Sequence, residues 1–157
     1  MNSWGEIAMP IIKQTIWVSV SDGAGYRVFS RQKPGGPLKQ LTKWTSDEAR
    51  KRTEELGTER PGRSQAAPGQ ARHAFANKAD WHDQAEKQTA RKLAHFLNRK
   101  YLAKKFDRLV LIAPPKTLGE MRPVLKFRRE KDVVQEYTKD LVNLSIHQLQ
   151  AYLEKNL

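Results

Sequence analysis

Hydrophobic and polar residues alternate in the first regularly patterned stretch of the chain, residues 15–21. In the sequence TIWVSVS, the isoleucine and both valines share one face, whereas Trp17 lies on the other. This two-residue period is typical of a β-strand. The Asp-Gly-Ala-Gly sequence at residues 22–25 favours a tight turn, and residues 26–29 resume a strand-like pattern. The pattern therefore predicts a β-hairpin.

Three further segments have the pattern of strands. Residues 38–44 follow a Pro-Gly-Gly-Pro turn and carry many polar side chains, which is typical of a strand at or near a sheet edge. The sequence RLVLIA at residues 108–113 is apolar after its first residue, which indicates a buried, parallel-type strand. Residues 132–137, DVVQEY, predict a short fifth strand.

Three other segments have the spacing of helices. Asp80 is predicted to cap a helix of about six turns. A Thr-x-x-Glu capping box at residues 117–120 predicts a second helix, which Pro123 is expected to shorten or kink. Capping-box spacing at residues 145–148 predicts a third. The apolar faces are Trp81, Ala85, Thr89, Leu93, Phe96, Leu97 and Tyr101 in the first helix, and Ile146, Leu149 and Leu153 in the last.

These elements predict an α/β fold in one domain spanning residues 1–157. Three strands and a long connection are followed by helix, strand, helix, strand and helix. This order is typical of a mixed sheet, here of five strands, with helices packed on it. A chain of this length suits one core, because each half alone would bury little apolar surface.

The long connection shows no apolar periodicity. A short helix is expected over residues 46–56, and a loop is expected over residues 57–79, where proline and glycine recur. Residues 60–78 contain three arginines and a lysine but no carboxylate. Loops of this length are usually functional or disordered. The sequence therefore predicts a long, positively charged loop before the first helix.

The net charge of the whole chain is +12, and its isoelectric point is near 10.1. A polyanion is the natural partner of such a surface, because lysine and arginine near phosphates release condensed counterions. A basic, solvated surface that only keeps the protein soluble is the alternative.

The chain contains no cysteine. This excludes disulfides, thiolate catalysis and cysteine-based metal sites, and it fits a reducing compartment. We find no window of about 20 apolar residues and no charged start of a secretory signal, so we expect a cytoplasmic protein without membrane insertion.

The sequence also contains, in this order, the strings TIWVSVSDGAGYRVF, ERPGRS, GQARHA, FDRLVLIAPPKTLGEMRPVL and KDLVNLS. These strings resemble the bacterial host-attachment protein family, the group described as required for attachment to host cells. The resemblance extends from Thr15 to the last predicted helix.

That family in turn resembles the middle domain of eukaryotic and archaeal class I peptide release factors. This implies a ribonuclease H-like mixed sheet with a long loop before its long helix. In release factors the loop carries Gly-Gly-Gln, whose glutamine helps water to attack the peptidyl-tRNA ester. Pro68-Gly69-Gln70 stands in the corresponding place here, with proline replacing the first glycine. The resemblance makes Gln70 the candidate catalytic residue.

The basic loop and the basic face of the long helix are the predicted nucleic-acid-binding elements. Arginines there can bind phosphates, while glycines let the backbone approach a ligand closely. Alternatively, the loop folds back and its arginines pair with the glutamates at positions 54, 55 and 59. The candidate residues are Arg60, Arg63, Ser64, Gln70, Arg72, His73, Arg91 and Arg99.

Other chemistries have less support in the sequence. His73 has no carboxylate at a telling spacing, and His82 with Glu86 provides only two possible metal ligands. Asp22 occupies a position where ribonuclease H enzymes bind metal, but turn formation explains it well. We therefore expect no metal site and no small-molecule cofactor.

Three functional hypotheses remain. The first is binding of structured RNA, such as the ribosome or tRNA, through the basic loop and helix. The second is an interaction protein that acts, directly or indirectly, in attachment to host cells. The third is a hydrolase of peptidyl-tRNA or aminoacyl-tRNA esters in which Gln70 positions water. Binding is favoured over enzymatic activity.

Overall fold

The computed structural model describes residues 14–47, 68–127 and 133–156, and for residues 68–82 it describes the backbone alone. The short helix expected over residues 46–56 lies outside these ranges from residue 48 onward. The loop residues up to 67 also lie outside them.

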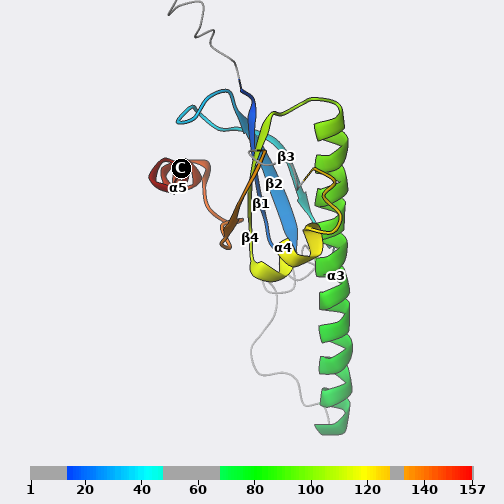
Figure 1. Cartoon of the computed structure of the whole chain (residues 1–157). Helices are drawn as coiled ribbons and strands as arrows, with labels where there is room; N and C mark the ends of the chain where they lie inside the picture. The colour runs from blue at the N-terminus through cyan, green and yellow to red at the C-terminus, as the bar shows by residue number, and fades with distance from the viewer. Residues whose placement is uncertain (1–13, 48–67, 128–132, 157) are drawn as a thin grey trace, which may run out of the picture.

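Five strands form one mixed sheet, as the sequence predicts (Figure 1). Their spatial order is β3-β2-β1-β4-β5, which places the polar strand β3 at one edge. β1 pairs antiparallel with β2 and β2 with β3, whereas β1 pairs parallel with β4 and β4 with β5. The strands are β1 (Ile16–Ser21), β2 (Gly25–Arg31), β3 (Lys39–Thr45), β4 (Arg108–Ala113) and β5 (Val134–Thr138).

Helices cover both faces of this sheet. α3 (Pro68–Leu102) and α4 (Pro115–Met121) lie on one face, and α5 (Ile146–Asn156) lies on the other (Figure 1). The predicted α/β class, with helices packed on a five-stranded mixed sheet, is thus confirmed. With 35 residues, α3 is about 50 Å long, more than twice the length of the strands, and its amino-terminal part extends past the sheet.

The predicted start of α3 at Asp80 is wrong, because the helix begins at Pro68. Residues 68–79 are therefore helical and do not belong to a loop. Proline is compatible with the first turn of a helix, and residues 71–79 contain four alanines, the strongest helix formers. This part of α3 lies past the sheet, so it has no sheet surface to cover and shows no apolar periodicity.

The predicted capping box of α4 is also wrong, whereas that of α5 is confirmed. α4 begins at Pro115 without a side-chain cap, and Thr117 is buried inside the helix. Proline at the first position has no N–H that needs a partner. In front of α5, the Ser145 N–H donates to Gln148 Oε1 (2.9 Å), and the Gln148 N–H donates to Ser145 Oγ (3.1 Å).

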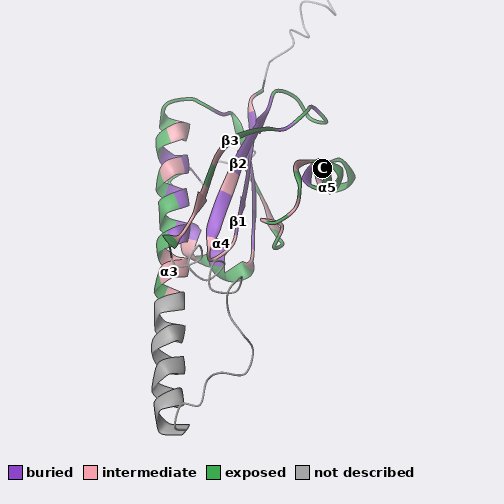
Figure 2. Ribbon diagram, turned by 180° about the vertical axis from the view of Figure 1, so that it is seen from behind, coloured by how far each residue is buried: buried purple, intermediate pink, exposed green. Residues whose placement is uncertain are grey.

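The sheet separates two apolar cores, and Figure 2 shows buried residues along the strands between the helical layers. All six residues of β1 are buried, as are five of the six in β4. Alternate residues of β1 therefore enter opposite cores, as predicted. Trp17, Leu93, Leu97, Phe106 and Leu111 lie in the core under α3 and α4, and Ile16, Val18, Val20, Leu149 and Leu153 lie in the core under α5.

A buried asparagine joins α3 to the segment after α4. Asn98 is 5% exposed, and its Nδ2 donates to the carbonyl oxygen of Val124 (2.8 Å). The N–H of Lys126 donates to Asn98 Oδ1 (2.9 Å). One side chain thus satisfies two backbone groups that are distant in the sequence.

Asn98→Ala is expected to lower the free energy of unfolding by about 1 to 2 kcal/mol, because it leaves these two partly buried backbone groups without partners. Urea denaturation measures the change. Gln88→Ala, at an exposed position of the same helix, is the control and should change stability by less than about 0.5 kcal/mol. Equal, small effects of both substitutions would contradict the role of Asn98.

Candidate nucleic-acid interface

The outer face of α3 carries a row of basic side chains. Arg91, His95 and Arg99 are exposed and follow one another at four-residue spacing, which places them on one helix face. Leu93 and Leu97 point into the core between them. The structure therefore brings Arg91 and Arg99, both predicted from the sequence, onto one surface about 12 Å apart along the helix axis.

The two arginines are not neutralised by the part of the protein that the structure describes. No carboxylate among these residues forms an ion pair with Arg91 or Arg99. Lys87, one turn before Arg91, is instead paired with Asp83 (3.4 Å). Within the described part of the chain, both guanidinium groups therefore lack a carboxylate partner.

Four lysines extend this surface. The ammonium group of Lys92 lies 5.0 Å from the centre of the Trp44 ring, and that of Lys100 lies 5.6 Å from the centre of the Phe96 ring. Lys104 and Lys105 are exposed directly after the helix. Helical periodicity indicates Lys100 but misses Lys104 and Lys105, since both follow the end of the helix. We refer to Arg91, Lys92, Arg99, Lys100, Lys104 and Lys105 as the α3 basic surface.

The end of α3 holds Lys104 in an unusual backbone conformation. Its φ angle is +57°, in the left-handed region where glycine is favoured. The Lys104 N–H donates to the Tyr101 carbonyl (2.9 Å), and the Lys105 N–H donates to the Lys100 carbonyl (3.0 Å). These two bonds form a Schellman motif, in which a glycine normally occupies the position of Lys104. A positive charge is therefore present where backbone energetics alone would favour glycine.

The other predicted binding residues are not brought together with this surface. Arg60, Arg63 and Ser64 lie outside the described residues. Gln70, Arg72 and His73 lie in the first turns of α3, where only the backbone is described. Gln70 therefore belongs to a helix, about 30 Å along its axis from Arg91. The interpretation of Gly69-Gln70 as part of a loop before the long helix is wrong.

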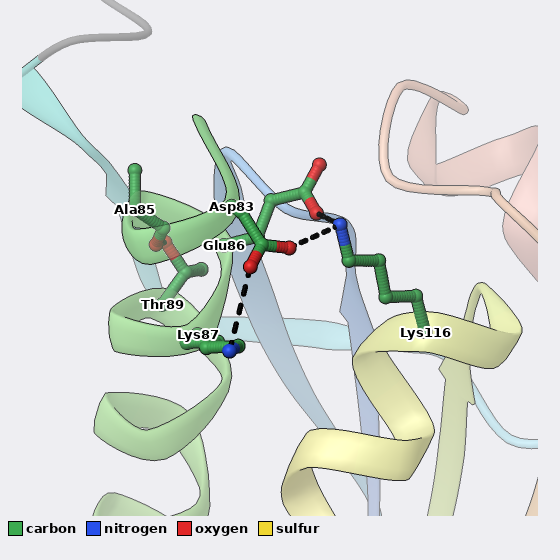
Figure 3. Close-up of polar contacts among 6 residues, drawn as sticks. All are labelled: Asp83, Ala85, Glu86, Lys87, Thr89 and Lys116. Atoms are coloured by element: carbon green, nitrogen blue, oxygen red, sulfur yellow. Dashed lines mark hydrogen bonds and ion pairs between the residues drawn. The ribbon is translucent and has the colours of Figure 1, made fainter. Parts of the chain in front are cut away.

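A cluster of charged residues fixes α3 against α4 where β1 and β4 end (Figure 3). Lys116 Nζ lies 2.6 Å from Asp83 Oδ1 and 2.8 Å from Glu86 Oε2. Hydrogen bonds from Lys116, and then from Lys87, hold the pKa of Asp83 below its ordinary value. Bonds to Asp83, and then to Glu86, raise the pKa of Lys116 above its usual range. These pairs are partly exposed, so we assign them a positioning role.

The hairpin turn between β1 and β2 packs against the same cluster. A Cβ atom on Gly23 would lie 2.2 Å from Cγ of Glu86, so the turn and the helix approach as closely as only glycine allows. Asp22 Oδ1 accepts hydrogen bonds from the N–H groups of Ala24 (2.8 Å) and Gly25 (3.0 Å). Its carboxylate thus stabilises the turn, as the sequence indicates.

This end of the sheet offers little for metal chemistry. Within the described ranges, no three histidine, aspartate or glutamate side chains converge as metal ligands would. Glu86, half of the histidine–glutamate pair noted in the sequence, is engaged by Lys116.

The fold and this surface define a class: a mixed α/β sheet between helical layers, with a basic outer helix. The family model described as "Protein required for attachment to host cells" matches residues 17–153, and the chain belongs to this host-attachment family. No curated protein matches the sequence. Within the described residues, no helix is both long and apolar enough to cross a membrane.

Lys104→Gly is expected to raise the free energy of unfolding by up to about 1 kcal/mol, because glycine adopts a positive φ without steric cost. Thermal or urea denaturation measures this change. Lys105→Gly, one residue later and without a positive φ, is the control and should not stabilise the protein. A loss of stability in Lys104→Gly would show that the lysine side chain itself supports the helix end.

Proposed function

We propose that this host-attachment family protein binds structured RNA, such as the ribosome or tRNA, through the α3 basic surface. The observation that carries this proposal is the row of exposed arginines on α3 without carboxylate partners among the described residues. Guanidinium groups match phosphate oxygens in a bidentate geometry. Folded RNA presents phosphates along its backbone, which such a row can contact.

The arrangement of charge on the two helical layers supports the assignment to α3. Residues 91–105, at the end of α3 and directly after it, carry two arginines and four lysines, whereas α5 carries one lysine, Lys155. A net charge of +12 also attracts polyanions at long range. The α3 basic surface adds to this attraction a defined geometry, because the packed face of the helix fixes the positions of its outer residues.

The resemblance to the middle domain of class I release factors supports the ribosome or tRNA as the RNA concerned. In this comparison, the part of α3 that extends past the sheet would reach toward the RNA. Ester hydrolysis by Gln70 has no comparable support. Gln70 lies in the first turn of α3, and its predicted role depended on a place in a loop.

Replacement of the two outer arginines tests this function. Arg91→Gln with Arg99→Gln is expected to weaken binding to purified ribosomes or tRNA. It should also reduce the slope of log Kobs against log salt by about 1.4 to 1.8, since each lost phosphate contact contributes about 0.7 to 0.9. Lys139→Gln with Lys155→Gln removes the same charge from exposed positions outside α3 and is the matched control.

Two results would refute the proposal. One is that the unmodified protein binds neither ribosomes nor tRNA at low salt. The other is that the arginine pair and the lysine pair weaken binding equally, which would mean that net charge alone is responsible. Lys104→Gly adds a check, because it removes a charge from the α3 basic surface without loss of stability.

We further propose that the protein acts in the cytoplasm and that its part in attachment to host cells is indirect, through RNA. The family description supports a role related to attachment. The absence of cysteine fits a reducing compartment. Cell fractionation is expected to recover the protein with a cytoplasmic marker and together with ribosomes or tRNA. Recovery from the cell surface would contradict both statements.

A further inference from the structure

A second arginine site lies on the opposite face of the sheet, beneath the carboxyl end of α5. Arg31, the last residue of β2, is 4% exposed. Among the described residues, its Nε has no hydrogen-bond partner, and no carboxylate forms an ion pair with it. A buried donor without a partner is uncommon in folded proteins, because burial removes its water and supplies nothing in exchange.

Arg31 lines a cavity of about 290 Å³ at the amino-terminal ends of β1 and β4. Ile16 pairs with Arg31 on one side and with Arg108 on the other, so the three residues lie side by side across three strands. Residues paired in this way project from the same face of a sheet. Ile16 packs in the core under α5, and both arginines therefore flank it on that face.

The remaining walls of the cavity are largely apolar and are held in place. Ile16 and Val110 supply apolar surface from the core under α5, and Leu109 and Val133 also line the cavity. The carboxyl end of α5 is fixed beside it by a short chain of hydrogen bonds. Gln135 Nε2 donates to Tyr137 Oη (2.8 Å), which in turn donates to the carbonyl oxygen of Asn156 (3.0 Å). The cavity is thus formed before any ligand binds.

The electrostatic surroundings of Arg31 favour an added anion. Burial lowers the pKa of Arg31, and the carboxylate of Glu154 acts in the opposite direction without forming an ion pair. Arginine nevertheless stays protonated in proteins. The exposed guanidinium of Arg108 adds a second positive charge at the cavity. Among the described residues, the lining of the cavity thus contains two cations and no carboxylate.

We propose that this cavity binds a small organic anion, with its carboxylate or phosphate group between Arg31 and Arg108 and its apolar part against Ile16, Val110 and Val133. The anion supplies the acceptor that Arg31 Nε lacks, and guanidinium groups pair well with both kinds of oxyanion. The volume suits a ligand of roughly the size of one aromatic ring with a substituent. This site is independent of RNA binding by α3, since the sheet lies between them.

Binding of three probes tests the proposal: benzoate, phenyl phosphate and inorganic phosphate, titrated into the full chain by calorimetry. We expect saturable binding of benzoate or phenyl phosphate, and the stronger of the two identifies the anionic group. Inorganic phosphate should bind more weakly, because it lacks an apolar part. Arg31→Met and Arg108→Gln should each weaken binding at least about tenfold. Lys155→Gln and the α3 arginine variants are controls and should bind as the unmodified protein does.

The melting temperature of the ligand-free variants distinguishes a role of Arg31 in anion binding from a role in the stability of the fold. Arg31→Met is expected to melt at the same or a higher temperature, because an apolar side chain of similar length replaces a buried charge that has no ion-pair partner among the described residues. Arg108→Gln alters an exposed residue, so it remains informative if Arg31→Met does not fold. The proposal is overturned if no probe binds saturably, or if both variants bind the probes like the unmodified protein. A lower melting temperature of Arg31→Met without probe binding would assign Arg31 to the fold alone.

Discussion

The structure depends on the burial of its two central strands on both faces. Every residue of β1 and all but the first of β4 are removed from water, so apolar side chains emerge above and below the sheet. A parallel pair of this kind is stable only when helices cover both faces. The long α3 with α4 on one side, and α5 on the other, meet this requirement (Figure 1). This packing sets the positions of the residues in the α3 basic surface.

In α3, packing of one helix face against the sheet determines the direction of the side chains on the opposite face. Its buried stripe, with Leu93, Leu97 and Asn98, fixes the rotation of the helix against the sheet. Arg91 and Arg99 are directed outward as a consequence. The pairs between Lys116 and the carboxylates of α3, together with the close approach at Gly23, also fix the helix along its length. The same cluster occupies the end of the sheet where β1 and β4 finish, the edge at which open α/β sheets commonly bind ligands.

The arginines of this protein occupy two contrasting environments. Those of α3 are exposed to water, so the high dielectric weakens the direct attraction between arginine and phosphate. Most of the binding free energy of such a pair comes from the release of counterions. Arg31 is buried beside a cavity and has no ion-pair partner among the described residues. A small anion would offset the cost of burying its charge. The first environment suits a large, hydrated polyanion, and the second suits a small, partly apolar one.

The sequence by itself determined the strands and the α/β class, because alternation and apolar runs directly reflect burial in a sheet. It also determined the family, through the strings that resemble host-attachment proteins. It also determined the cap of α5 and the outward position of Arg91 and Arg99, which follow from helical spacing. It failed at the start of α3, where alanine content extends the helix and no apolar face reveals the boundary. It also failed at the start of α4, where a proline at the first position begins the helix without a side-chain cap.

Only the tertiary structure decided the contacts between residues distant in the chain. Asn98 with Val124, Gly23 with Glu86, and Ile16 with both Arg31 and Arg108 are examples. In the sequence, nothing distinguishes Arg31 from an ordinary exposed charged residue at the end of a strand. It lies beside β1, level with Arg108 and near the carboxyl end of α5, and this placement leaves no local pattern in the sequence.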